Sequence, residues 1–165
     1  GDNRSNFKES GIEIKANGKT VKVDPNKPAE QYSWEDMQAI IDTLNKLDPK
    51  HHYRRPTEAE WEYSARAGTN TKYSYGESEE DLKYYGYFDQ NSGSQTQNVA
   101  TLKPNPYGLY DMHGNVWEWV EDWYDGKLKG GKNPKGPSSG SGRVIRGGSW
   151  DYYAQYLRSA CRSSS

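Results

Sequence analysis

The chain has 165 residues, a net charge of −1 and a pI near 6.4. This size suits one globular domain, and the even charge balance excludes the basic footprint of a nucleic-acid-binding protein. No apolar run reaches the length of a membrane span, so we expect no membrane insertion by this chain. Because 14 Tyr and 6 Trp accompany few aliphatic residues, we expect a core built largely from aromatic side chains.

The first predicted element is a β-hairpin. Residues 12–23 alternate apolar and polar side chains around Asn17 and Gly18. An Asn-Gly pair between alternating runs is a strong signal for a two-residue hairpin turn. We therefore interpret residues 11–27 as a hairpin segment.

Two helices are predicted next, each with a capping box. Ser33 and Asp36 have the spacing of such a box, and Pro49 ends the pattern. Thr57 and Glu60 repeat the signal before a second helix, which Gly68 should stop. The apolar residues expected to face the core are Met37, Ile40, Ile41, Leu44 and Leu47 in the first helix, and Trp61 and Ala65 in the second.

The rest of the chain lacks a helical period. Residues 69–106 are polar and dotted with tyrosines, so we expect loops and short strands there. Residues 108–124 form the densest aromatic stretch, and residues 125–142, rich in Gly, Lys, Pro and Ser, should form a long loop. Residues 143–150 indicate a short strand that enters a tight turn at Gly147 and Gly148.

Asn115, Glu118 and Asp122 offer oxygen atoms to a hard cation such as calcium. Their spacing matches no EF-hand loop, so a network that pins loops between tryptophans is an alternative, and both interpretations stay open. His51 and His52 are adjacent and would point to opposite faces of an extended segment. We predict neither a resident metal nor a cofactor.

Cys161 is the single cysteine of the chain, which excludes an internal disulfide. Arg158 and Arg162 lie close in sequence and could favour its thiolate form. A nucleophile needs a positioned base, and no histidine is near Cys161 in the sequence. We therefore expect a packed or surface cysteine rather than a catalytic one.

The chain closes with a mixture of Tyr, Ser and Asp between Asp151 and Ser165. Terminal aromatic residues often fill a core. Tyr and Ser are also typical of adaptable recognition surfaces, because Tyr supplies rigid amphipathic area and Ser supplies adaptable hydrogen bonds. Composition alone leaves both interpretations open.

Four motifs carry a family resemblance. They are "RRPTEAEWEYSARAG", "NPYGLYDMHGNVWEWVEDWY", "NPKGPSSGSGRVIRGGSW" and "LRSACR", and "GDNRSNFK" and "YSWEDM" look like earlier landmarks. In this order they resemble the formylglycine-generating-enzyme, or sulfatase-modifying-factor, family. The resemblance implies an α+β, C-type lectin-like fold with two helices, short twisted antiparallel strands and long loops. It also implies a single domain over residues 1–165 that lacks the family's outermost terminal segments and carries the 11–27 hairpin as an insertion.

The same resemblance argues against an enzyme. The family's catalytic cysteines would fall near Tyr152 and Ala154, and neither position is cysteine. Without the paired thiolates we expect no copper site and no formylglycine formation.

A narrower resemblance is to variable proteins of diversity-generating retroelements, in which adenines at the end of the gene are rewritten. Asparagine codons in a template would yield the residue types found here at eight places. Ala154, Gln155, Leu157, Arg158, Ser159, Ala160 and Arg162 match the unchanged part of such a pattern. The eight expected variable, ligand-binding positions are Asp151, Tyr152, Tyr153, Tyr156, Cys161, Ser163, Ser164 and Ser165.

The leading functional hypothesis is a non-enzymatic, receptor-type protein that displays this hypervariable surface. It should bind an unknown protein or surface ligand, at a bacterial or phage surface or outside the cell. Trp117, Trp119, Trp123 and Trp150 are expected to pack the scaffold. The alternatives are an inactive family member that binds a sulfatase-type peptide and an oxidase that uses Cys161.

Overall fold

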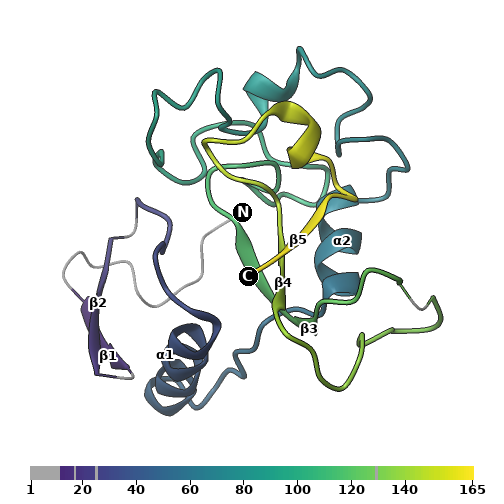
Figure 1. The fold of residues 1–165 in the computed structure, drawn as a ribbon. Helices are drawn as coiled ribbons and strands as arrows, with labels where there is room; N and C mark the ends of the chain where they lie inside the picture. The colour runs from purple at the N-terminus through teal and green to yellow at the C-terminus, as the bar shows by residue number, and fades with distance from the viewer. Residues whose placement is uncertain (1–11, 17, 25, 129) are drawn as a thin grey trace. The chain divides into compact units, whose positions relative to one another are not determined.

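The structure is a computed structural model that describes residues 12–16, 18–24, 26–128 and 130–165. It contains two α-helices and short antiparallel strands, joined by long loops (Figure 1). Two compact units meet in the sequence between Arg54 and Arg55, and each is described by itself below. None of the helices in the described ranges is long and apolar enough to cross a bilayer.

The N-terminal unit contains the predicted hairpin. Strand β1 (Ile12–Ala16) pairs antiparallel with β2 (Lys19–Val23), and Ile12 lies opposite Val23. Asn17 of the predicted turn, and the "GDNRSNFK" segment, lie outside the described residues. The hairpin is therefore present, whereas its status as an insertion and the single-domain interpretation of residues 1–165 stay predictions.

Helix α1 (Trp34–Leu47) begins with the expected capping box. The Ser33 hydroxyl accepts from the Asp36 amide at 3.1 Å, and the Asp36 carboxylate accepts from the Ser33 amide at the same distance. The apolar cluster on this helix is centred on Ile40, with Met37 and Leu44 packed against it. The prediction was wrong for Leu47, which is 61% exposed because it lies in the final turn, beyond that cluster.

The C-terminal unit combines helix α2 (Glu58–Arg66) with a three-stranded antiparallel sheet. The strands are β3 (Glu118–Trp123), β4 (Arg143–Arg146) and β5 (Arg162–Ser164), with β4 in the centre. Thr57 and Glu60 form the expected capping box of α2, and the helix closes on Ala67 in a left-handed conformation. Two short 3₁₀ turns, η1 (Leu82–Tyr84) and η2 (Ala154–Leu157), complete the unit.

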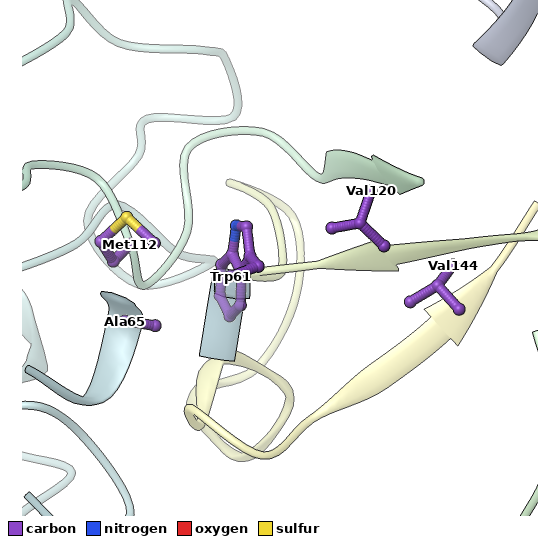
Figure 2. Close-up of a cluster of buried hydrophobic side chains, with 5 residues drawn as sticks. All are labelled: Trp61, Ala65, Met112, Val120 and Val144. Atoms are coloured by element: carbon purple, nitrogen blue, oxygen red, sulfur yellow. The ribbon is translucent and has the colours of Figure 1, made fainter. Parts of the chain in front are cut away.

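Two buried clusters form the core of this unit. Figure 2 shows the first, in which Trp61 and Ala65 of α2 are grouped with Met112 and with Val120 and Val144 of the sheet. Residues 69–106 are mainly irregular, as predicted, yet they supply most of the second cluster. Its members are Tyr73, Leu82, Phe88, Ala154 and Leu157.

The tryptophans expected to pack the scaffold are only partly buried. Trp117, Trp119, Trp123 and Trp150 all keep intermediate exposure, whereas Trp61 is buried to 3% exposure. Trp119 and Trp123 lie on β3, which is an edge strand of the three-stranded sheet, whereas Trp117 and Trp150 lie outside the strands.

The glycine turn at the end of β4 is structural, as expected. Gly147 and Gly148 have φ values of 93° and 80°, which strain any residue with a Cβ atom. A Cβ on Gly148 would lie 2.7 Å from Cδ1 of Leu157, which is fully buried. The turn therefore lets the backbone pass directly over the side chain that anchors η2.

Candidate functional site: the C-terminal surface

The eight predicted variable positions all reach the surface. Six are exposed, and two, Cys161 and Ser163, have intermediate exposure. Of the seven positions between them, Ala154, Leu157 and Ser159 are buried. The other four are not, because Gln155, Arg158 and Ala160 are exposed and Arg162 has intermediate exposure. Three buried side chains thus hold a segment whose remaining side chains reach solvent.

These positions fall into two groups on different elements. Asp151, Tyr152 and Tyr153 precede η2 and Tyr156 lies within it. These four residues together with Trp117 are called the tyrosine surface below. The Tyr152 ring meets Tyr156 edge-on at 5.7 Å between centroids and Trp117 edge-on at 5.3 Å. The second group, Cys161 and Ser163 to Ser165, lies at and beside β5.

The backbone under the tyrosine surface is held by side chains from elsewhere. The buried Tyr73 hydroxyl donates to the Ala154 carbonyl at 2.9 Å, and Nδ1 of buried His113 donates to the Leu157 carbonyl at 2.9 Å. The Asp89 amide donates to the Tyr152 carbonyl at 3.1 Å. No contact of this set depends on a side chain at a predicted variable position.

His113 is fixed as a neutral imidazole. Its Nδ1 faces a carbonyl, which can only accept, while its Nε2 accepts from the Ser74 amide at 3.1 Å. Burial lowers the pKa of His113 from 6.5 to about 4. The sequence pattern assigned His113 no specific role, and its hydrogen bond to the Leu157 carbonyl emerges only from the fold.

A buried arginine holds the next part of the segment. Arg146 of β4 is fully buried, and its guanidinium donates to Glu58 at 3.1 Å and to Glu62 at 2.6 Å, both on α2. The same guanidinium donates to the Ser159 carbonyl at 2.8 Å. Arg162 of β5 pairs with both oxygens of Glu58. The sequence showed no sign of this network, because arginine is rarely buried.

Asn115, Glu118 and Asp122 do not form a joint site. The Asn115 amide exchanges two hydrogen bonds with the Gln97 backbone, Glu118 accepts from the Trp61 indole at 2.6 Å, and Asp122 accepts from the Glu58 amide at 2.7 Å. Over the described ranges, His, Cys, Asp and Glu do not gather in threes as metal ligands. The three side chains therefore pin separate segments, which fits the network interpretation.

Glu118 provides a pH test of this arrangement. Burial raises the pKa of Glu118 from 4.5 to about 7, against the opposing hydrogen bond from Trp61. The folded protein therefore holds the proton of Glu118 more tightly than the unfolded chain does. The contribution of this proton to stability is complete below pH 4.5 and is lost as the pH rises through 7, which lowers the free energy of unfolding by about 3 kcal/mol. His113 acts in the opposite direction, because its lowered pKa removes stability as the pH falls from 6.5 to 4.

Glu118→Gln is expected to be more stable than the parent protein at pH 8 by up to about 3 kcal/mol, and nearly equal to it at pH 4.5. The glutamine carbonyl can still accept from the Trp61 indole, so the hydrogen bond is retained. Urea unfolding of both proteins between pH 4.5 and 8 measures the difference. A difference that stays constant over this range would contradict the assignment.

Cys161 has no catalytic surroundings. Its thiol is free and half-exposed, and it makes no hydrogen bond to an acid or base in the part of the chain described here. The His113 ring is engaged on both nitrogens by Leu157 and Ser74. Thiol catalysis needs a base positioned at the nucleophile, and the residues described in the structure place none at Cys161.

Comparison with known proteins shows which family shares this sequence and fold. The family model of the sulfatase-modifying factor enzyme 1-like domain matches residues 4–165. The formylglycine-generating enzyme of Streptomyces coelicolor is 35% identical over 162 residues, which cover 86% of this chain and 48% of that enzyme. The chain thus spans about half the length of this relative.

Solved structures of similar proteins support the same fold. Treponema denticola variable protein 1 superimposes with a TM-score of 0.65 and 48% identity, covering 68% of this chain and 41% of that one. PvdO from Pseudomonas aeruginosa gives a TM-score of 0.68 and 26% identity, covering 96% and 67%. The predicted α+β, C-type lectin-like fold is confirmed. The chain belongs to the sulfatase-modifying-factor family.

Proposed function

We propose that this protein is a non-enzymatic binding protein whose C-terminal segment displays variable side chains on a constant backbone. The eight variable positions are those predicted from the sequence, in the tyrosine surface and along β5. The likeness to Treponema denticola variable protein 1 supports this proposal. The ligand is an unknown protein or surface molecule.

The observation that carries the proposal is the difference in burial along residues 151–165. Buried Ala154, Leu157 and Ser159 fix the backbone, while the eight proposed positions face solvent fully or in part. Substitution at those eight places changes the surface and leaves buried Ala154, Leu157 and Ser159 in place. A segment whose outward side chains can change freely is suited to the selection of new ligands.

The chemistry of the tyrosine surface suits recognition. Tyr152, Tyr153 and Tyr156 are 39%, 66% and 42% exposed, so each offers a large ring and a hydroxyl to a partner. The edge-on stacking on Trp117 restricts the Tyr152 ring before binding, which lowers the entropy lost on complex formation. Tyrosines held in this way are typical anchors of an interface.

Two libraries test the proposal directly. In the first, the eight positions are randomised together; in the second, Ala154, Leu157, Ser159 and Arg162 are randomised. We expect most members of the first library to fold, as measured by protease resistance on a display particle, and most members of the second to be degraded. Equal survival of the two libraries would contradict the proposal. Selection of the first library against an arbitrary protein should then yield binders.

The genomic counterpart of this test is the DNA that follows the gene. We expect a near-copy of the gene end that differs mainly at adenines, beside a reverse-transcriptase gene. We also propose a bacterial or phage surface, or the extracellular medium, as the location, because a diversified binder needs access to foreign partners.

The similarity to formylglycine-generating enzymes favours one competing function, in which an inactive family member binds a sulfatase-type peptide. Titration with a peptide that carries the sulfatase cysteine motif separates the two proposals. Binding that survives replacement of Tyr152, Tyr153 and Tyr156 by alanine would support the peptide-binding alternative.

A further inference from the structure

One cavity of the C-terminal unit is lined by none of the variable positions. It has a volume of about 390 Å³ and lies between α2, the end of β3 and loop residues 127, 128 and 130–137. This volume is in the range of small-molecule sites. Its apolar lining comes mainly from Tyr63, Trp123, Leu128, Pro134 and Pro137. Arg162 is the one residue of the segment 151–165 that lines it, and Arg162 is among the unchanged positions.

The charged groups of this cavity are mostly neutralised by each other. Glu58 pairs with Arg146 and Arg162, and Glu62 pairs with Arg66 at 2.8 Å and with Arg146. Asp125 is close enough to Arg162 to interact with it electrostatically. Lys127 lies on the exposed loop at the rim.

Asp122 differs from these groups. Its side chain belongs to a residue that is only 5% exposed, and it lines the cavity at the end of β3. One carboxylate oxygen accepts from the Glu58 amide at 2.7 Å. Its charged neighbours are the acids Glu58 and Glu121, and burial together with these neighbours raises the pKa of Asp122. A cation beside Asp122 would relieve the cost of this buried negative charge.

We propose that the cavity binds a small organic amine, with the ammonium group at Asp122 and an apolar body between Tyr63, Trp123 and Leu128. The Tyr63 and Trp123 rings, Leu128 and the two prolines offer apolar contact area to the body of the ligand. The Arg143 guanidinium already stacks on the Trp123 ring at 3.6 Å from its centroid, so the ammonium group is placed at Asp122 and not over that ring. None of the eight variable positions lines the cavity. The specificity of this site is therefore constant, whatever the tyrosine surface binds.

The test uses the full chain and 2-phenylethylamine as the probe, with 2-phenylethanol as the neutral probe of the same shape. We expect saturable shifts of the Trp123 indole signal in NMR spectra with the amine and at least tenfold weaker binding of the alcohol. Asp122→Asn keeps an acceptor for the Glu58 amide and should weaken amine binding about tenfold, the equivalent of one partly buried ion pair. Asp42→Asn removes an exposed carboxylate of α1 that does not line the cavity and should leave the affinity unchanged.

Three results would overturn the proposal: no saturable shift with the amine, equal binding of the alcohol, or an unchanged affinity of Asp122→Asn. If Asp122→Asn fails to fold, the amine affinity of Tyr63→Lys tests the proposal instead. Tyr63 is 66% exposed, so its replacement should be tolerated. The added ammonium group should weaken amine binding, whereas Tyr63→Gln should weaken it less. Equal affinities of these two variants would also overturn the proposal. Neither result depends on the variable positions, so failure here leaves the display proposal intact.

Discussion

Replacement of Arg146 with methionine is expected to lower the free energy of unfolding by about 3–5 kcal/mol. Arg146 is fully buried, and its guanidinium contacts two carboxylates of α2 and the backbone of the C-terminal segment. Methionine fills much of the same volume but leaves the Ser159 carbonyl and part of Glu62 without their donor. Since small domains have about 5–15 kcal/mol of stability in total, this loss is a large share of it.

The matched control is Arg158→Met, which changes the same residue type in the neighbouring segment. Arg158 is exposed, and its side chain donates a local hydrogen bond to the Gln155 carbonyl at 2.7 Å. We expect a loss below about 1 kcal/mol for this variant. Urea unfolding monitored by tryptophan fluorescence measures both. Similar losses for the two variants would show that burial of Arg146 has no special role.

Adjacent residues of η2 are expected to respond in opposite ways. Leu157→Ala should lower the free energy of unfolding by about 2–5 kcal/mol, because Leu157 is completely buried among Tyr73, Leu82 and Phe88. Tyr156→Ala should cost less than about 1 kcal/mol, because Tyr156 is 42% exposed and its ring contact is with Tyr152 at the surface. For ligand affinity we expect the reverse: a larger loss from Tyr156→Ala than from Leu157→Ala.

Denaturant titrations give the stabilities, and a binder selected from the randomised library gives the affinities. Tyr156→Ala should weaken binding of a ligand selected on the parent surface by tenfold or more, as for an aromatic anchor. Leu157→Ala should retain most of the affinity under conditions where the variant is folded. The display proposal does not survive a large stability loss from Tyr156→Ala together with unchanged binding.

Local signals predicted the regular elements well. The capping boxes at Ser33 and Thr57 and the strand before Gly147 need only a few neighbouring residues, and all three lie where the sequence placed them. The short strand β5 and turn η2 were not predicted, because three or four residues carry no usable period. Their form depends on distant partners such as Tyr73 and Arg146.

The sequence could indicate which residues of the candidate site face solvent. It could not indicate which side chains hold the backbone beneath them. The residue types indicated eight outward-facing side chains, and these are fully or partly exposed. They did not separate the two sets completely, because Gln155, Arg158 and Ala160 of the unchanged set are exposed as well. The side chains that hold the backbone beneath them come from residues about 40 to 80 positions away, as His113 and Tyr73 illustrate. Such contacts leave no spacing pattern. The amine cavity was missed for the same reason, since its walls combine a helix, a strand end and a loop.

Glu58, at the start of α2, has a consequence for how this unit unfolds. Its amide is bonded to Asp122 of β3, and its carboxylate is bonded to Arg146 of β4 and Arg162 of β5. The helix and all three strands therefore share one junction, and no strand can detach without breaking it. Such sharing makes unfolding cooperative, so the C-terminal segment does not fray independently. The variable surface proposed for this segment would therefore stay ordered between encounters with a ligand.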